Sequence, residues 1–414
     1  MRLLIILLAS STLSACGGAG NQTVGSASTP AAVGGGTPGT GSTPSSGHTF
    51  VAPTEVKTYS GIGGVHSYQY TTNNLGANPL PVGVQGTSTQ YNQLYAGDAT
   101  TARNSNISIT YNPRDAIFDL VINQPSGNVN QTVRFQDPAH RTDFGGASQP
   151  QDGVPNLAAS GIQYLEVGSG SGTLVYDSSQ SNIFPIGGDG ASVRRSTFFL
   201  QKPGTTTKYV TFAGFVRNAT STALIVPAAG ASFIEQNNSL ERAAFAFGER
   251  SSNSGVPTTG TGTYSGDMIG TLVFNPLLDT DASAPTYFQW LAGRATTIVD
   301  FAASKFTIAL NGSVTPPGFD VYTTRTFALP AGSTFAAAGA GRIDLVAAGG
   351  FLGQFSSASF TYPDTTIFNL NIAGSSVDGA FFGPIANEVG GGFRIVGGTP
   401  DERIDILGTF VGGK

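Results

Sequence analysis

Three histidines, His48, His66 and His140, are the residues whose side chains could most directly do chemistry. An imidazole nitrogen can bind a metal ion or serve as an axial ligand of haem iron. None of the three stands at metal-ligand spacing from another His, a Cys or a carboxylate, so the sequence predicts no metal site. His66 and His140 are candidate haem ligands, with a tyrosine as an alternative axial ligand. The other interpretation is that they are solvated loop side chains.

Patterns for catalysis or nucleotide binding are missing from the sequence. No Gly-x-Ser-x-Gly elbow, phosphate loop or dinucleotide fingerprint joins an expected strand to a helix. The glycine-rich run GSGSG at 168–172 is followed by no helical pattern, and RR at 194–195 is a lone basic pair. The net charge of −5 gives no attraction to nucleic acid. We therefore expect no catalytic residue, no cofactor other than haem as a ligand, and no nucleic-acid partner.

A targeting segment precedes the single cysteine of the chain. The apolar run at residues 3–8 is too short to span a bilayer and predicts a signal peptide over residues 1–15. The end of this segment, LSAC at 13–16, resembles the lipobox of bacterial lipoproteins. The resemblance implies that Cys16 is diacylated on sulfur, becomes the new N-terminus and anchors the protein to a membrane. By analogy with other lipoproteins, the glycines that follow Cys16 imply sorting to the outer membrane.

Composition divides the rest of the chain into a tether and a β-rich body. Residues 16–54 are dominated by Gly, Ser, Thr and Pro and cannot bury enough apolar area to fold, so they predict a flexible tether. Beyond it, only 11% charged residues and 57 glycines favour short strands joined by glycine-rich turns. The fold class that we predict is all-β, with a handle-like β domain at 55–255 and a barrel at 256–414.

Alternating apolar residues locate the strands. In the first domain they mark 107–111, 116–122 and 208–216, whereas 237–247 favours a short helix. In the second domain we expect strands at 261–274, 294–301, 304–311, 324–329, 341–347, 351–361, 366–372, 377–383, 390–396 and 404–411. So many short antiparallel strands predict a closed up-and-down barrel, because closure removes exposed sheet edges.

The C-terminal residues carry a long ordered motif. It reads GAFFGPIANEVGGGFRIVGG and is followed by ILGTFVGGK at the end of the chain. This motif resembles the C-terminal signature of transferrin-binding protein B-type surface lipoproteins. The matching positions are Gly379, Phe381, Phe382, Gly383, Pro384, Ala386, Glu388, Gly390, Gly391, Phe393, Gly408, Phe410, Gly412, Gly413 and Lys414. The residues themselves predict structural roles: Phe381, Phe393 and Phe410 as barrel packing, Pro384 at the start of a helical turn, and Glu388 as an acceptor for backbone N–H groups of that turn. The rival interpretation makes Glu388 a catalytic acid or a ligand contact.

The resemblance implies a single lobe, made of a handle domain and an eight-stranded barrel. Single-lobed members of the family bind haem proteins, haem or host regulatory proteins. Members reach the cell surface through an outer-membrane translocator, and some work beside a TonB-dependent transporter. The function expected is therefore capture of an extracellular iron- or haem-related ligand at the cell surface. An adhesive, structural or host-factor-binding lipoprotein without a nutrient role is the alternative. Loops at 72–100, 136–160 and 178–195 are candidate ligand contacts, or merely tolerated insertions.

Overall fold

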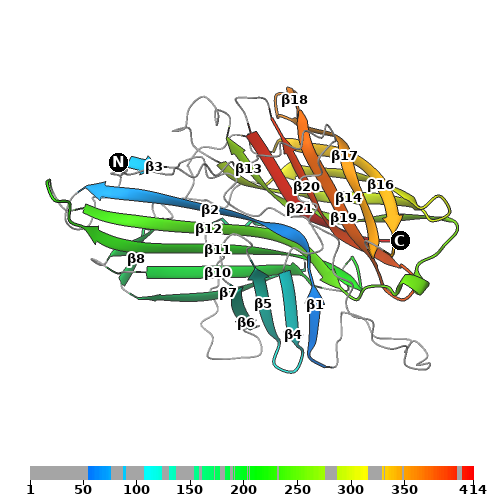
Figure 1. Ribbon diagram of the computed structural model, residues 1–414, viewed down its shortest axis with the longest axis horizontal. Helices are drawn as coiled ribbons and strands as arrows, with labels where there is room; N and C mark the ends of the chain where they lie inside the picture. Colours follow the sequence, from blue (N-terminus) through cyan, green and yellow to red (C-terminus); the bar gives the residue numbers. More distant parts are fainter. Residues whose placement is uncertain are drawn as a thin grey trace, which may run out of the picture.

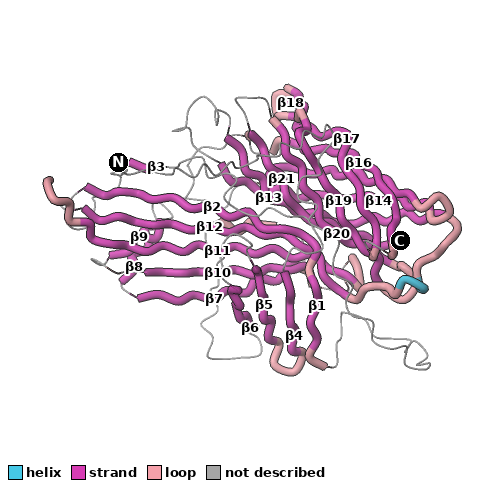
Figure 2. Tube along the Cα trace, viewed as in Figure 1, coloured by secondary structure: helices cyan, strands magenta, loops and turns pink. Residues whose placement is uncertain are grey.

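The computed structural model describes residues 55–75, 87–89, 107–123, 130–136, 153–157, 161–171, 173–177, 182–186, 190, 192–202, 204, 206–230, 233–275, 287–315, 329–330, 332–346, 349–398 and 403–414. Within these ranges the chain is almost wholly β, and the helical element is one short 3-10 turn, η3 (Asn253–Gly255) (Figure 2). The predicted signal peptide, Cys16, the tether, His48 and His140 lie outside them. No helix in the described part is long and apolar enough to cross a membrane.

Strands β1 to β12 form the part that we call the handle, at the left and bottom of Figure 1. Its larger sheet holds, in order, β3 (Thr87–Thr89), β2 (Ile62–Leu75), β12 (Phe233–Gly248), β11 (Val210–Ile225), β10 (Ser192–Gln201) and β7 (Ile162–Ser171). Its smaller sheet holds β1 (Lys57–Ser60), β4 (Ile107–Asn112), β5 (Ile117–Asn123) and β6 (Asn130–Gln136). A separate hairpin pairs β8 (Thr173–Asp177) with β9 (Asn182–Ile186).

The two handle sheets pack face to face over a common apolar core. The alternating residues expected from the sequence supply its smaller-sheet side, since Ile107, Ile109, Phe118, Leu120 and Ile122 are all buried there. Phenylalanines of β10, β11 and β12 supply the other side. The handle is thus a β sandwich, in which each sheet turns one apolar face toward the other.

The remaining long strands close into a barrel, which is the predicted architecture. Its eight strands are β13 (Thr261–Asn275), β14 (Tyr287–Asp300), β15 (Lys305–Val314), β16 (Thr334–Asp344), β17 (Gly350–Thr361), β19 (Ile372–Phe382), β20 (Glu388–Gly397) and β21 (Arg403–Gly413). Neighbours pair in the order β16-β15-β14-β13-β21-β20-β19-β17, and the β16–β17 pairing closes the ring. Short β18 (Ile367–Asn369) adds to β17 only. The all-β fold with an eight-stranded antiparallel barrel is confirmed.

Side chains fill the inside of the barrel. Phe351 is fully buried and contacts the rings of Phe306, Phe381 and Phe410 at centroid distances of 4.7, 5.4 and 6.3 Å. Phe306, Ile308 and Leu310 of β15 point into the same core, as their alternation predicts. An eight-stranded barrel is about wide enough for side chains to fill. This interior is therefore a packed core and not a compartment for a ligand.

Several predicted elements differ from those observed. The helix expected at 237–247 is wrong, because these residues belong to strand β12. Both faces of β12 are buried there, one against the smaller sheet and one against the barrel, so its apolar residues do not alternate. The barrel strands also begin earlier than expected at β14 and β16. The strand expected at 324–329 falls almost entirely outside the described residues.

Candidate functional site at the handle–barrel junction

The larger handle sheet lies against the outer wall of the barrel, over strands β13, β14, β19, β20 and β21. We call this contact the junction. Its apolar part joins Ile62, Phe199, Val210, Phe212, Val216, Ala244 and Ala246 of the handle to Ile269, Trp290, Ala380, Phe382 and Val411 of the barrel. Domains are expected to move against each other unless their interface is large and apolar. This continuous core instead favours a handle and a barrel that form one rigid body.

Glu388 links the two parts through a buried carboxylate at the start of β20. Its Oε1 accepts a hydrogen bond from the backbone N–H of Lys208 at 2.6 Å. Its Oε2 accepts from Tyr209 and Val210 at 2.8 and 3.0 Å. Burial raises the pKa of Glu388, while the three N–H groups and the charge of Lys208 act in the opposite direction. Glu388 does accept backbone N–H groups, but they come from the handle and not from its own turn as predicted.

The turn before Glu388 holds the segment that leaves the handle. Gly383 N–H donates to the carbonyl of Glu249, and Ser251 N–H donates to that of Phe381, at 2.9 and 2.8 Å. Gly383 has φ +81°, a value that glycine adopts without strain, and a Cβ there would lie 2.7 Å from the Tyr209 ring. Residues 383–386 form a turn and not the helical turn expected at Pro384. The motif therefore ties the chain entering the barrel to the end of β19.

The other motif residues lie in the barrel wall or inside it. Phe381, Phe393 and Phe410 are in the barrel core, as is Ala386, whose carbonyl accepts from the Tyr264 hydroxyl at 2.8 Å. Phe382 faces the handle. Glycines make room for aromatic rings or neighbouring strands at Gly379, Gly390, Gly391 and Gly408. The motif thus builds the barrel wall against which the handle docks.

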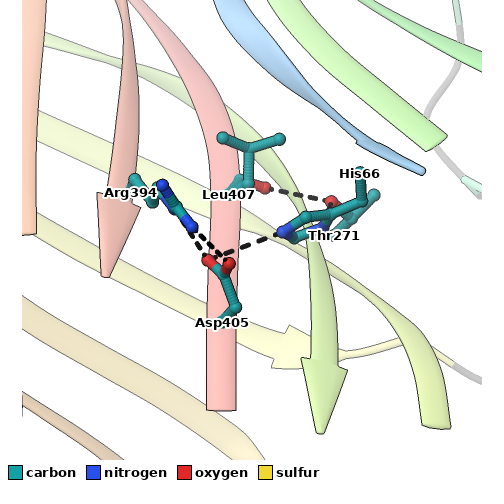
Figure 3. Close-up of polar contacts among 5 residues, drawn as sticks. All are labelled: His66, Thr271, Arg394, Asp405 and Leu407. Atoms are coloured by element: carbon teal, nitrogen blue, oxygen red, sulfur yellow. Dashed lines mark hydrogen bonds and ion pairs between the residues drawn. The ribbon is translucent and has the colours of Figure 1, made fainter. Parts of the chain in front are cut away.

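His66 of β2 enters a buried polar network on the barrel surface (Figure 3). Its Nδ1 lies 2.8 Å from Oγ1 of Thr271, and its Nε2 lies 3.5 Å from Oδ1 of Asp405. Arg394 holds the same carboxylate with two hydrogen bonds, Nε to Oδ1 at 3.0 Å and Nη2 to Oδ2 at 2.7 Å. The Thr271 hydroxyl also lies 3.4 Å from the carbonyl of Leu407. One handle residue thereby contacts two barrel strands, β13 and β21.

Thr271, His66 and Asp405 have the residue types of a hydroxyl, imidazole and carboxylate triad, but they cannot act on a substrate here. The Thr271 side chain has no exposed surface, and those of His66 and Asp405 are 3% and 1% exposed. Arg394 also neutralises the carboxylate. His66 is thus neither a solvated loop residue nor accessible to haem iron while the handle is docked. Among the described residues, no group of three His, Cys, Asp or Glu side chains could hold a metal ion.

Asp405 gives the junction a predictable acid response. Burial alone would raise the pKa of Asp405, but His66 and Arg394 outweigh it and lower the pKa to about 2. Because an unfolded Asp titrates near 3.9, this stabilisation is complete above about pH 5 and is lost as pH falls from there through the folded value. We expect a loss of roughly 2 kcal/mol between about pH 4.5 and pH 2, measured by urea unfolding. Asp405→Asn should remove that part of the acid response, and an unchanged pH profile in this variant would contradict the assignment.

Most of the described residues in the three candidate loops are buried in the fold or belong to strands. In the loop at 136–160, the structure describes residues 153–157, and Gly153 to Pro155 are buried. Indole Nε1 of Trp290 donates to the carbonyl of Gly153 at 2.8 Å, and the Tyr164 hydroxyl donates to that of Pro155 at 2.9 Å. Parts of the other two loops belong to strands β2, β3, β9 and β10. Apart from Gln136 and Gly190, the rest of the three loops lies outside the described residues.

Thr271, Arg394 and Asp405, the partners of His66 in the network, were not among the site residues predicted from the sequence. A signal was present for two of them: Arg394 is the one charge in GGFRIVGG, and Asp405 stands between two isoleucines of RIDILGTF. A charge on such a strand is seldom buried unless it is paired. Thr271 carries no such signal. No pattern in the sequence links His66 to partners that lie 205 and more residues further along the chain.

No protein-family model and no curated protein matches this chain. Solved structures that match over most of it include several of transferrin-binding protein B. A mutant from Haemophilus parasuis Hp5 is 11% identical, with 86% of this chain and 78% of that chain covered and a TM-score of 0.28. Intact Ap-TbpB, with N and C lobes, is also 11% identical, with 87% of this chain and 79% of that chain covered and a TM-score of 0.28. The isotype 1 protein from serogroup B Neisseria meningitidis is 11% identical, with 87% of this chain and 77% of that chain covered and a TM-score of 0.23. The C-terminal motif of this chain resembles the same family.

Proposed function

We propose that this protein is a surface-exposed outer-membrane lipoprotein that captures an extracellular ligand without catalysing a reaction. The observation that carries the proposal is the set of hydrogen bonds that Glu388 of the barrel accepts from the handle. This residue belongs to the C-terminal motif, and its carboxylate holds three handle N–H groups. The motif therefore has a structural meaning, since it joins a handle to a barrel in one lobe. The division at 55–255 and 256–414 follows this joint and is part of the proposal.

The rest of the proposal concerns presentation and the place of binding. Lipid on Cys16 and a flexible tether over 16–54 would hold the body away from the membrane. Because aromatic side chains fill the barrel, the ligand would bind on the outer surface, for which handle loops are the natural place. We propose an iron- or haem-related ligand, passed to a TonB-dependent transporter. His140 is the proposed haem ligand that remains, since the docked handle buries His66.

The test uses the full-length lipoprotein, purified in detergent and titrated with haemin. We expect a Soret band that His140→Ala abolishes and that a matched His48→Ala control keeps. The same protein, immobilised, should retain a haem or iron protein from the natural growth medium. No spectral change together with no retained protein would overturn capture, and retention of host surface components alone would favour adhesion. In cells, Cys16→Ser should abolish membrane attachment, and fractionation measures this separately from binding.

A further inference from the structure

The apolar part of the junction combines large and small residues. The rings of Phe199 and Trp290 pack edge to face across it with their centroids 5.6 Å apart, while Ala244 and Ala246 of the handle and Ala380 of the barrel contribute small side chains. Gly392 of the barrel approaches Gly63 of the handle without side chains between them, since a Cβ on Gly392 would lie 2.8 Å from Cα of Gly63. Contacts at these small residues change little when one strand slides past another, so directional polar contacts are better suited to set the alignment there. The junction has two sets of them, the hydrogen bonds of Glu388 and the network around His66.

The polar network supplies directional contacts at the same interface. Arg394 and Asp405 pair within the barrel, through a two-bond fork between neighbouring strands β20 and β21. This fork orients Oδ1 of Asp405 toward the handle, where it meets His66 at 3.5 Å. The other nitrogen of His66 must meet Thr271 on β13 at the same time. A shift of the handle would separate His66 from one or both of these partners.

We propose that the His66–Thr271–Asp405–Arg394 network sets the docking register of the handle on the barrel, while the apolar contacts supply the affinity. Buried ion pairs generally add little stability compared with apolar residues of similar volume, yet breaking one partner is costly. Buried polar groups are known to select a single register in other assemblies. Here the network has the geometry for that role, since its four side chains come from four strands on both sides of the junction.

The experiment compares breaking the network with replacing it. Asp405→Asn in the full-length chain breaks it, whereas the triple variant His66→Leu, Arg394→Met, Asp405→Leu replaces it with apolar side chains. Asp344→Asn is the control, because Asp344 pairs with Arg342 at 3.7 Å where the Arg342 side chain is 68% exposed. Thermal unfolding reports stability. Hydrogen exchange of the Lys208, Tyr209 and Val210 amides reports docking, since these amides bond to Glu388 across the junction.

We expect Asp405→Asn to lower the unfolding midpoint and to speed exchange at the three amides by roughly tenfold or more. The triple variant should unfold near the wild-type midpoint and still exchange roughly tenfold faster at these amides, because docking is no longer unique. Slow, wild-type exchange in the triple variant would overturn the proposal. A triple variant that fails to fold would overturn it too, since the network would then supply stability. The control should match the wild type in both measurements.

Discussion

Replacing Glu388 with alanine is expected to lower the free energy of unfolding by roughly 3–5 kcal/mol, since three backbone N–H groups lose their acceptor at once. These donors are Lys208, Tyr209 and Val210, and the last lies in the junction core. A buried donor left without a partner costs about 1–3 kcal/mol. Glu388→Gln keeps one oxygen but places an amide N–H against the remaining donors, so about half of the loss should persist.

Urea unfolding followed by two signals measures this effect and locates it. Trp290 is the only tryptophan of the chain and lies in the junction core, so its fluorescence reports on docking. Far-ultraviolet circular dichroism reports on all strands. We expect the fluorescence transition of Glu388→Ala to move to lower urea before the dichroism does. Asp364→Asn is the matched control, because Asp364 accepts one backbone N–H, from Thr366, in an exposed turn. If both variants behave alike, Glu388 does not hold the handle.

The strands that could be predicted from the sequence are those with one buried face. In β15, the residues Phe306, Ile308 and Leu310 enter the barrel core, while Lys305 before them and Thr307 between them are exposed. Such a strand has the alternation of period two from which strands are recognised. The sequence contains enough strands of this kind to predict a closed barrel. That prediction depends on the number of strands and not on the conformation of the loops between them.

The junction could not be predicted from the sequence, because there the outer face of a barrel strand is buried as well as its inner face. In β21, Ile404 and Ile406 enter the barrel, but Asp405 and Leu407 between them are covered by the handle and are buried as well. In β12 the same double burial removes the alternation, so the segment resembled a helix. Which faces meet is a property of the tertiary fold. His66, Arg394 and Asp405 therefore become neighbours only in the tertiary fold, when the handle packs on the barrel.

Gly392→Ala is expected to cost about 3 kcal/mol, at the upper end of what overpacking usually costs, because the added methyl group meets a backbone and not a side chain. A Cβ at this position would lie 2.8 Å from Cα and 3.1 Å from N of Gly63. Neither atom can turn aside, so strand β2 of the handle must move away from β20. His66 lies three residues beyond Gly63 on β2, and the same movement would separate it from Thr271 and Asp405.

Gly168→Ala is the matched control for this prediction. Gly168 lies in handle strand β7, and a Cβ there would be 3.7 Å from the nearest atom, the carbonyl oxygen of Arg194, which is an ordinary contact. This variant should keep wild-type stability or gain up to about 1 kcal/mol, since alanine restricts the unfolded chain more than glycine. Trp290 fluorescence and urea unfolding compare the two variants. Equal stability of Gly392→Ala and Gly168→Ala would mean that the handle tolerates displacement from the barrel, and a rigid junction would then be excluded.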